Sequence, residues 1–497
     1  MEKYVSDEEE NLKSSQYEQH NYHSTIAAAF LVSSNVDDYK KMASKEDFEA
    51  AIATSALLQK EYDPHDFGNT DHPTSFWGTV FHLVIISFGP ATLTLPKSFQ
   101  AAGYIVGFAI TLIIVYLYAY NMHMLVCSEY KLCKLKRVPH MTYSETLHVA
   151  ISEGPEGIRW LASYCRFFIY VIFIVEWLGC CSLTVVLLSE NLQTIYRFVY
   201  EHPVTSSSAT EAELRTIMLC LMVPMMLLAS IRKLNYLVPF SVAATTINAF
   251  CMLVIVYYII VEPWPKELSR GFQSVTNVPH IAGAVLFNLS AAGIIMPLKN
   301  EMKNPRKFGN GFSVLVVSYI PVSISYAIFG LICSLKYGDT LKASVIQNLP
   351  GDQLLGQVAI ALSTVTMAFI FPLPVYIVVD VLWNDILRDK HEKLNCLVLW
   401  EFALRGVIVV ISFLAAYLVP NIPLFLSFSG TVCTSIDGII VPAVIEMLVV
   451  WRLSPSKSKF FVPTVFKNIS IIVLGFVLIV TGSMTCVKDI IDFYAKK

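Results

Sequence analysis

The stretch His82-Leu-Val-Ile-Ile-Ser-Phe-Gly-Pro-Ala-Thr-Leu-Thr-Leu-Pro96 lies in an apolar run long enough to cross a membrane, yet it carries residues that interrupt a helix. Pro90 removes a backbone N–H donor and clashes with the preceding turn, and Gly89 tolerates unusual dihedral angles. The carbonyls freed by such a break are costly in lipid, so they must face protein or a water-filled cavity. The stretch therefore predicts a broken membrane helix, with a simple proline kink as the alternative.

The composition extends this interpretation to the whole chain. Of 497 residues, 55% are hydrophobic and only 15% are charged, which is too few charges to cover a soluble protein of this size. A block of about 20 apolar residues fits a bilayer core roughly 30 Å thick. We expect an all-α polytopic membrane protein with eleven transmembrane helices, at about residues 77–97, 103–127, 161–190, 215–231, 237–261, 280–298, 311–335, 354–382, 403–419, 424–450 and 467–487.

The first 76 residues differ in character from the rest. They carry fifteen acidic and six basic residues, a net charge of −9, and are expected to form a disordered cytosolic tail. The first apolar block begins near residue 77, so no signal peptide is expected. Placing the N-terminus in the cytosol puts most Lys and Arg of the connecting segments on the inner side. We therefore expect an eleven-helix domain at 77–490 and a short outer tail at 491–497.

A second interrupted block follows at 280–298, with Asn288, Ser290, Gly293 and Pro297 inside it. This block is the sixth along the chain, and the other interrupted block, at 77–97, is the first. These positions correspond if helices 1–5 and 6–10 form two inverted repeats, with one extra helix. Paired interruptions of this kind indicate a transporter site at the bilayer midplane. Half-helix N-termini can bind a carboxylate there, and half-helix C-termini an ammonium group.

The candidate substrate site follows from this pairing. We expect the substrate between the two breaks, with its carboxylate near Gly89 and Ala91. Trp177 and Tyr376 are expected to shape the side-chain pocket, although aromatic residues in helices more often serve packing. The predicted substrate-binding residues are Ser87, Gly89, Ala91, Thr92, Trp177, Phe287, Asn288, Ser290, Gly293 and Tyr376.

A family resemblance supports the same interpretation. The chain carries His82-Leu-Val with Gly89, Leu237-Val-Pro-Phe-Ser241, Asn348-Leu-Pro350 and the run from Val419 to Cys433. Over about residues 75–490 it resembles the proton-coupled amino acid transporter group of the amino acid/auxin permease superfamily. The resemblance implies eleven helices, a core of two inverted five-helix repeats and proton-driven symport of small neutral amino acids. It also implies that His82 is the proton-responsive histidine, and an imidazole does titrate between pH 5 and 8.

The chain departs from the family pattern at both breaks. The family's Gly-Asn-Ile-Gly-Thr-Gly is Ile86-Ser-Phe-Gly-Pro-Ala91 here, and its Phe-Glu-Gly in the sixth helix is Leu289-Ser290-Ala291, so an intramembrane acid is lost. Glu176 and Asp437 lie instead in the middle of the third and tenth blocks. Acids inside a membrane are expensive and point to a proton or substrate pathway. We hypothesise that one of them replaces the missing acid in proton coupling; the alternative is a structural carboxyl group.

The predicted function is a secondary active transporter of small neutral amino acids, coupled to protons. The alternative is an amino-acid-sensing membrane receptor that transports little. No convincing Ser/His/Asp set, metal cluster or phosphate-binding loop is present, so we expect no enzyme activity, no metal, no cofactor other than the coupling proton, and no nucleic-acid partner. We expect an integral multi-pass protein of the plasma membrane or of the lysosomal or endosomal membrane, with the lipid bilayer as its surroundings.

Overall fold

A computed structural model describes residues 62–67, 73–200, 207–232, 234–265, 271–273, 275–309, 313–387, 397–419, 422–453 and 461–495. The chain divides into two units, 1–67 and 68–497, and the second unit holds the membrane helices. Most of the predicted acidic tail lies outside the described residues. Within the described part the structure is helical, with one isolated parallel bridge between Thr74 and Met302.

Ten helical spans in the described part are long and apolar enough to cross a membrane, which confirms a polytopic all-helical protein. They correspond to the second to eleventh predicted blocks. Seven are single helices: α6 Tyr104–Lys136, α8 Ala162–Tyr200, α9 Ser207–Ala229, α10 Leu234–Val261, α14 Val314–Tyr337, α18 Leu397–Leu418 and α21 Phe461–Ala495. Three are composite: α11 Val278–Leu289 with α12 Ala292–Asn300; α15 Leu354–Ile370 with α16 Pro372–Asp380; and the π-helical turns η8 Ser429–Cys433 and η9 Ile436–Ile440 leading into α20 Val441–Leu453.

The first predicted block is divided by its Gly-Pro pair. Helix α4 covers Phe76–Ser87, a 3₁₀ turn η2 covers Pro90–Thr94, and α5 covers Leu95–Ala102. Neither α4 nor α5 alone is long enough to span a bilayer. The break predicted from Gly89 and Pro90 is therefore present, while the eleventh crossing and the inverted repeats stay predictions.

Shorter elements connect these helices and fix their ends. Helix α7 Tyr143–Ser152 begins with a capping box, in which the Thr142 and Glu145 side chains satisfy each other's backbone N–H groups. Gly103 ends α5 with φ of 97°, and a Cβ there would lie 2.6 Å from the carbonyl oxygen of Gly271. The remaining short elements are η1 Pro64–Asp66, η3 Glu156–Leu161, η4 Val275–Asn277, α13 Arg306–Gly309, η5 Gly338–Thr340, η6 Val345–Asn348, η7 Val381–Ile386 and α19 Ile422–Phe428.

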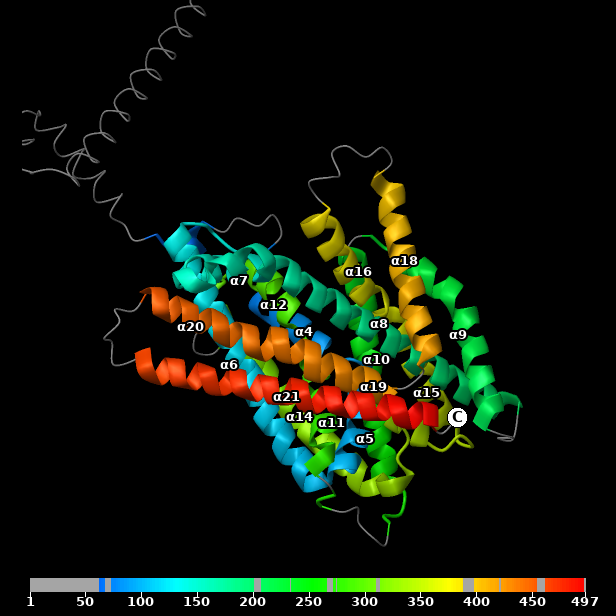
Figure 1. Ribbon diagram of the computed structural model, residues 1–497. Helices are drawn as coiled ribbons and strands as arrows, with labels where there is room; N and C mark the ends of the chain where they lie inside the picture. The colour runs from blue at the N-terminus through cyan, green and yellow to red at the C-terminus, as the bar shows by residue number, and fades with distance from the viewer. Residues whose placement is uncertain are drawn as a thin grey trace, which may run out of the picture. The chain divides into compact units, whose positions relative to one another are not determined.

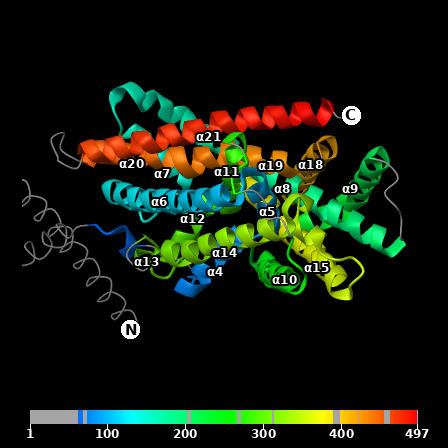
Figure 2. The same ribbon diagram turned by 90° about the horizontal axis from the view of Figure 1, so that it is seen from below.

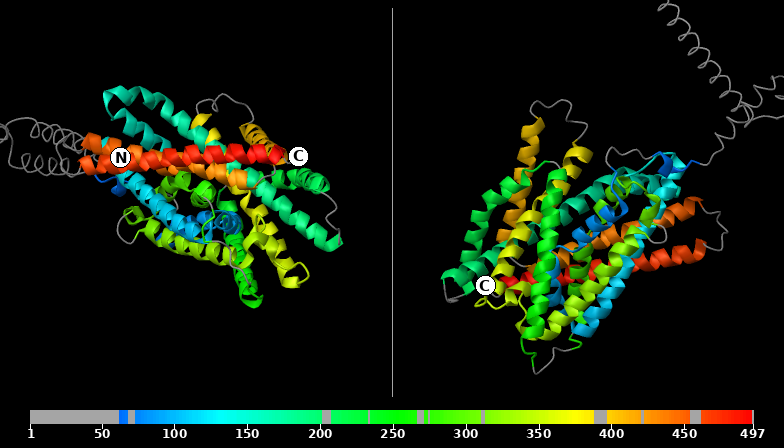
Figure 3. Two further views of the ribbon diagram at one scale, coloured as in Figure 1. Left: turned by 60° about the horizontal axis from the view of Figure 1, so that its bottom comes forward. Right: turned by 180° about the vertical axis from the view of Figure 1, so that it is seen from behind.

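Within the second unit, α5 packs against the longer helices α6 and α14, and α11 packs against α6, whereas Trp77 and Phe81 of α4 are exposed. Helices α20 and α21 run side by side in Figures 1 and 2, and α18 packs against α8 and α9. Seen from behind in Figure 3, the blue-cyan α6 and the yellow-green α14 lie together. Large apolar side chains such as Tyr116, Ile260 and Phe466 point outward and are mostly exposed. So much exposed apolar surface suits contact with lipid rather than water.

Candidate functional site

The first break is held by two polar side chains from other helices. The Tyr326 hydroxyl of α14 hydrogen-bonds the Ser87 carbonyl oxygen and lies 3.3 Å from that of Asn288. The Asn248 amide of α10 donates to the Phe88 carbonyl oxygen at 2.9 Å. The carbonyls freed by the Gly-Pro pair therefore face protein donors, as the cost of bare carbonyls in lipid requires. The helix is interrupted here, and side chains from other helices bind its free carbonyl oxygens, which a simple proline kink does not require.

The second break lies at Ser290 and Ala291, between α11 and α12. The Ala291 N–H donates to the Tyr118 hydroxyl oxygen of α6 at 2.9 Å. The Ser290 hydroxyl donates to Glu176 Oε1 of α8 at 2.6 Å. A contact of 3.4 Å between Thr92 Oγ1 and Asn288 Oδ1 joins the two breaks. The two interruptions predicted from the sequence are thus neighbours in space.

A cavity of about 90 Å³ lies between the breaks, α8 and the α15–α16 junction. One water needs about 10–15 Å³ of such space, so the cavity can hold several waters or one small molecule. Seven predicted residues line it: Gly89, Ala91, Glu176, Trp177, Phe287, Asn288 and Ser290. The other lining residues are Ile86, Cys180, Leu183, Thr184, Leu187, Ile370, Leu373 and Pro374, most of them apolar.

Four predicted substrate residues lie outside the lining. Ser87 and Thr92 are buried within the first break, and Thr92 reaches the cavity only through Asn288. Gly293 faces Phe173, whose ring would be 3.6 Å from an added Cβ. The Tyr376 ring lies 5.9 Å from the Arg405 guanidinium, beside the Glu401–Arg405 ion pair. These four residues therefore lie around the cavity without lining it.

The proton-site candidates separate into a pair and a single residue. Glu176 is buried, and its Oε1 accepts hydrogen bonds of 2.6 Å from both Ser290 and Thr434. Asp437 lies in η9, fully buried and close enough to Glu176 for the two carboxyl groups to interact electrostatically. His82, in contrast, is half-buried on α4 and is not part of the cavity lining.

The surroundings of this acid pair contain hydroxyl groups and no basic partner. None of the ion pairs in the described ranges involves Glu176 or Asp437. Neither carboxylate oxygen of Asp437 has a hydrogen-bond partner among the described residues that meets ordinary geometry. The Tyr143 hydroxyl binds the Asp437 backbone oxygen instead. The site thus holds two buried carboxyl groups that form no ion pair within the described part of the chain.

Sequence reasoning missed the residues that support these groups. Tyr118, Asn248, Tyr326 and Thr434 each contact a break or the acid pair, and all are buried. A polar side chain inside an apolar block was the available signal, because such groups seek partners within a membrane bundle. The sequence could not say which partners they find.

The fold and site together define a polytopic membrane protein with a small cavity between two broken helices. The sequence pattern of the transmembrane amino acid transporter protein family matches residues 72–487, and the chain belongs to that family. It is 28% identical over 457 residues to the proton-coupled amino acid transporter-like protein pathetic of Drosophila melanogaster, covering 92% of this chain and 93% of that protein. It is 24% identical over 420 residues to amino acid transporter AVT3A of Arabidopsis thaliana, covering 83% and 89% respectively. Members of this family are amino acid transporters and not enzymes.

Proposed function

We propose that the chain is a proton-coupled symporter of small neutral amino acids, which binds its substrate in the cavity between the two breaks. The observation that carries this proposal is the hydrogen bond from Ser290 to Glu176. Ser290 lines the cavity and ends α11, while Glu176 belongs to the buried acid pair. In this proposal the Ser290–Glu176 hydrogen bond links the substrate cavity to the proton-binding acid pair.

The lining chemistry supports a small neutral substrate. Glu176 is the only Asp, Glu, Lys or Arg among the lining residues, and most of the others are apolar. An apolar chamber with a few convergent polar groups is typical of small-molecule sites. We place the substrate carboxylate beside Gly89 and Ala91, and its ammonium group toward Asn288, Ser290 and Glu176.

The acid pair supports coupling to protons. Two carboxylates close together in a low-dielectric interior repel each other, so the pair is expected to share at least one proton. Arrival of an ammonium group beside Glu176 changes the electrostatics of that pair. In this proposal Glu176 takes the place of the acid that relatives carry at the position of Ser290. His82 stays a proposed proton-responsive residue that acts from outside the cavity.

The test uses purified protein in liposomes, so that it does not depend on which cell membrane the protein occupies. Uptake of radiolabelled glycine, alanine, serine and proline is measured with and without an imposed gradient between about pH 5.5 and about pH 7.4, on either side of the ordinary histidine pKa. We expect accumulation only with the gradient. Uptake that ignores the gradient would remove the coupling, and binding without uptake would favour the receptor alternative.

We further propose the cytosolic side for the N-terminus, and the plasma membrane or the lysosomal or endosomal membrane for the protein. The orientation is supported by the excess of Lys and Arg in the segments on that side. Antibody access to a tag at the N-terminus, with and without permeabilised membranes, tests the orientation. A tag that is reached from outside intact cells would reverse it.

A further inference from the structure

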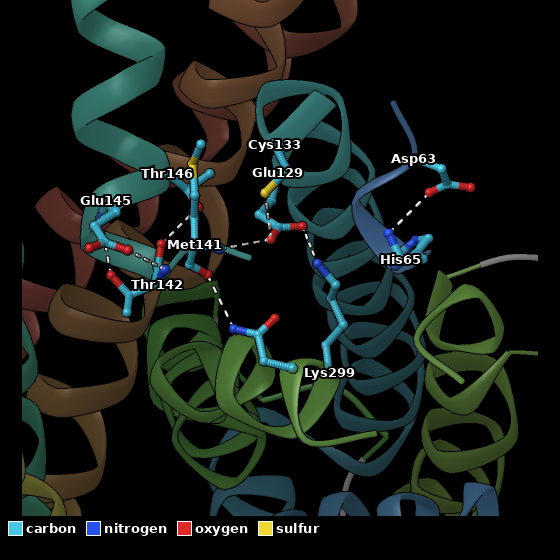
Figure 4. Close-up of polar contacts among 10 residues, drawn as sticks. Asp63, His65, Glu129, Cys133, Met141, Thr142, Glu145, Thr146 and Lys299 are labelled. Carbon is cyan, nitrogen blue, oxygen red and sulfur yellow. Dashed lines mark hydrogen bonds and ion pairs between the residues drawn. The ribbon is translucent and has the colours of Figure 1, made fainter. Parts of the chain in front are cut away.

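A second polar cluster lies at the far end of α12, away from the cavity. Lys299 at this end forms an ion pair with Glu129 of α6, and both side chains are almost completely buried. Figure 4 shows the two side chains pointing toward each other. The other oxygen of Glu129 accepts from the Met141 N–H and the Cys133 thiol, each at 3.2 Å. Glu129 is therefore satisfied by groups from three segments of the chain.

The same end of α12 is tied to the segment that precedes α4. The Thr74 N–H donates to the Glu301 carbonyl oxygen at 2.8 Å, and the Lys303 N–H donates to the Thr74 carbonyl oxygen at 2.9 Å. Thr74 and Met302 thus form a short parallel bridge. The segment just before α4 is therefore hydrogen-bonded directly to the segment just after α12.

Helix α12 connects this end to the cavity. Its nine residues rise about 13.5 Å. One end follows Ser290 and Ala291, which contact Glu176 and Tyr118, and the other end carries Lys299. Helix α12 therefore joins the second break to the Glu129–Lys299 pair, so a displacement of this helix at the cavity would alter the pair.

As long as both groups stay charged, the pair can separate at low cost only if water reaches both of them. A buried ion left without its partner is strongly unfavourable, because solvation lost on burial is no longer repaid. Separation of Glu129 from Lys299 therefore accompanies hydration of this end of the bundle. Such hydration would accompany an opening of the bundle between α6 and α12.

We propose that Glu129 and Lys299 are positioning residues that, with the Thr74–Met302 bridge, close the cavity on this side, and that these contacts must open for the substrate to leave. Under the orientation proposed above this is the cytosolic side. The inference rests on the proposed transport function, but it assigns a role to residues that touch neither substrate nor coupling proton.

A reversible cross-link tests whether opening is required. Bridged strands lie about 4.8 Å apart, within the 4.4–6.8 Å Cα range of disulfides, so a Thr74→Cys, Met302→Cys double variant can be oxidised in the closed state. We expect oxidation to reduce alanine uptake and alanine exchange at least tenfold, with recovery on reduction. The two single variants, oxidised in the same way, serve as controls. Full transport by the cross-linked protein would overturn the proposal.

A labelling experiment tests the ion pair without relying on transport. Cys180 lines the cavity, so its modification by a thiol reagent, located by mass spectrometry, reports opening. We expect Lys299→Met to accelerate the labelling of Cys180 severalfold and Glu129→Gln, Lys299→Met together to do so less. Lys136→Met is the matched control, because Lys136 pairs with Glu153 at a more exposed position near the same end of α6.

The two readouts separate failure of this inference from failure of the proposed function. Unchanged labelling of Cys180 in folded Lys299→Met protein would overturn the positioning role, even if alanine is transported. Accelerated labelling in a protein that transports no amino acid would support the closure and reject the transport function.

Discussion

The Ser290 hydroxyl donates a hydrogen bond of 2.6 Å to the buried carboxyl group of Glu176, across 114 residues of sequence. Ser290 caps the end of α11 at the second break, and Glu176 lies in the middle of α8. The family resemblance implies an acid at the position of Ser290. We propose that Glu176 takes the role of that acid from a neighbouring helix, because its carboxyl oxygen contacts the break through Ser290.

Removal of this contact should weaken coupling. A hydrogen bond to a charged group contributes about 1.5–3 kcal/mol, so Ser290→Ala is expected to lower gradient-driven alanine uptake on the order of tenfold or more. Ser290→Thr keeps the hydroxyl and should retain most of the activity. Equal loss in both variants would assign the effect to packing at the break rather than to the hydrogen bond.

Asp437 is expected to share the proton of the pair. Asp437→Asn keeps the size of the side chain but removes the negative charge that opposes ionisation of Glu176, so Glu176 should hold its proton less tightly. We expect gradient-driven accumulation to fall severalfold while exchange of internal for external alanine continues. Glu190→Gln is the control, because Glu190 accepts from Gln347 and lies outside the cavity lining. Normal accumulation by Asp437→Asn would limit the proton site to Glu176.

The hydrogen bonds from the Tyr326 and Asn248 side chains to the first break should contribute to the folding stability of the protein. Tyr326→Phe leaves the Ser87 carbonyl oxygen without this donor, which costs about 1–3 kcal/mol for a buried group. We expect a lower melting temperature of the detergent-solubilised protein. Tyr319→Phe is the matched control on the same helix, because the buried Tyr319 hydroxyl has no hydrogen-bond partner in the described part of the chain. Equal melting temperatures for the two variants would contradict the capping role of Tyr326.

His82 offers a separate test of pH response. The family resemblance implies that His82 is the proton-responsive histidine, so its loss should remove a contribution to the pH response of transport. We expect His82→Gln to flatten the rise of alanine uptake between about pH 7.4 and about pH 5.5. An unaltered pH profile would remove His82 from the proton mechanism.

The sequence predicted the breaks because their causes are local. Pro90 has no backbone N–H to continue the helix and Gly89 permits unusual dihedral angles, and α4 does end at Ser87. The second break falls at Ser290 and Ala291, within the predicted block. The apolar blocks likewise match ten spans, although α8 extends from Ala162 to Tyr200, beyond the predicted 161–190, since a helix can continue past the hydrocarbon core.

The partners were beyond prediction because they depend on packing between distant segments. Nothing near Ser290 in the sequence identifies Glu176, and nothing near Ser87 identifies Tyr326. The Glu129–Lys299 pair was missed because both residues lie near block ends, where a charge is ordinarily solvated. Tyr376 is predicted to shape the side-chain pocket, whereas its ring lies beside the Arg405 guanidinium and outside the cavity lining.

The most direct measurement follows alanine and protons together in liposomes that contain wild-type or Glu176→Gln protein, with a pH-sensitive dye inside. Our account predicts that an alanine gradient drives protons inward through the wild-type protein. It predicts that Glu176→Gln still exchanges alanine but moves no protons with it. Alanine-driven proton flux that persists unchanged in Glu176→Gln would contradict the coupling of the cavity to this carboxyl group.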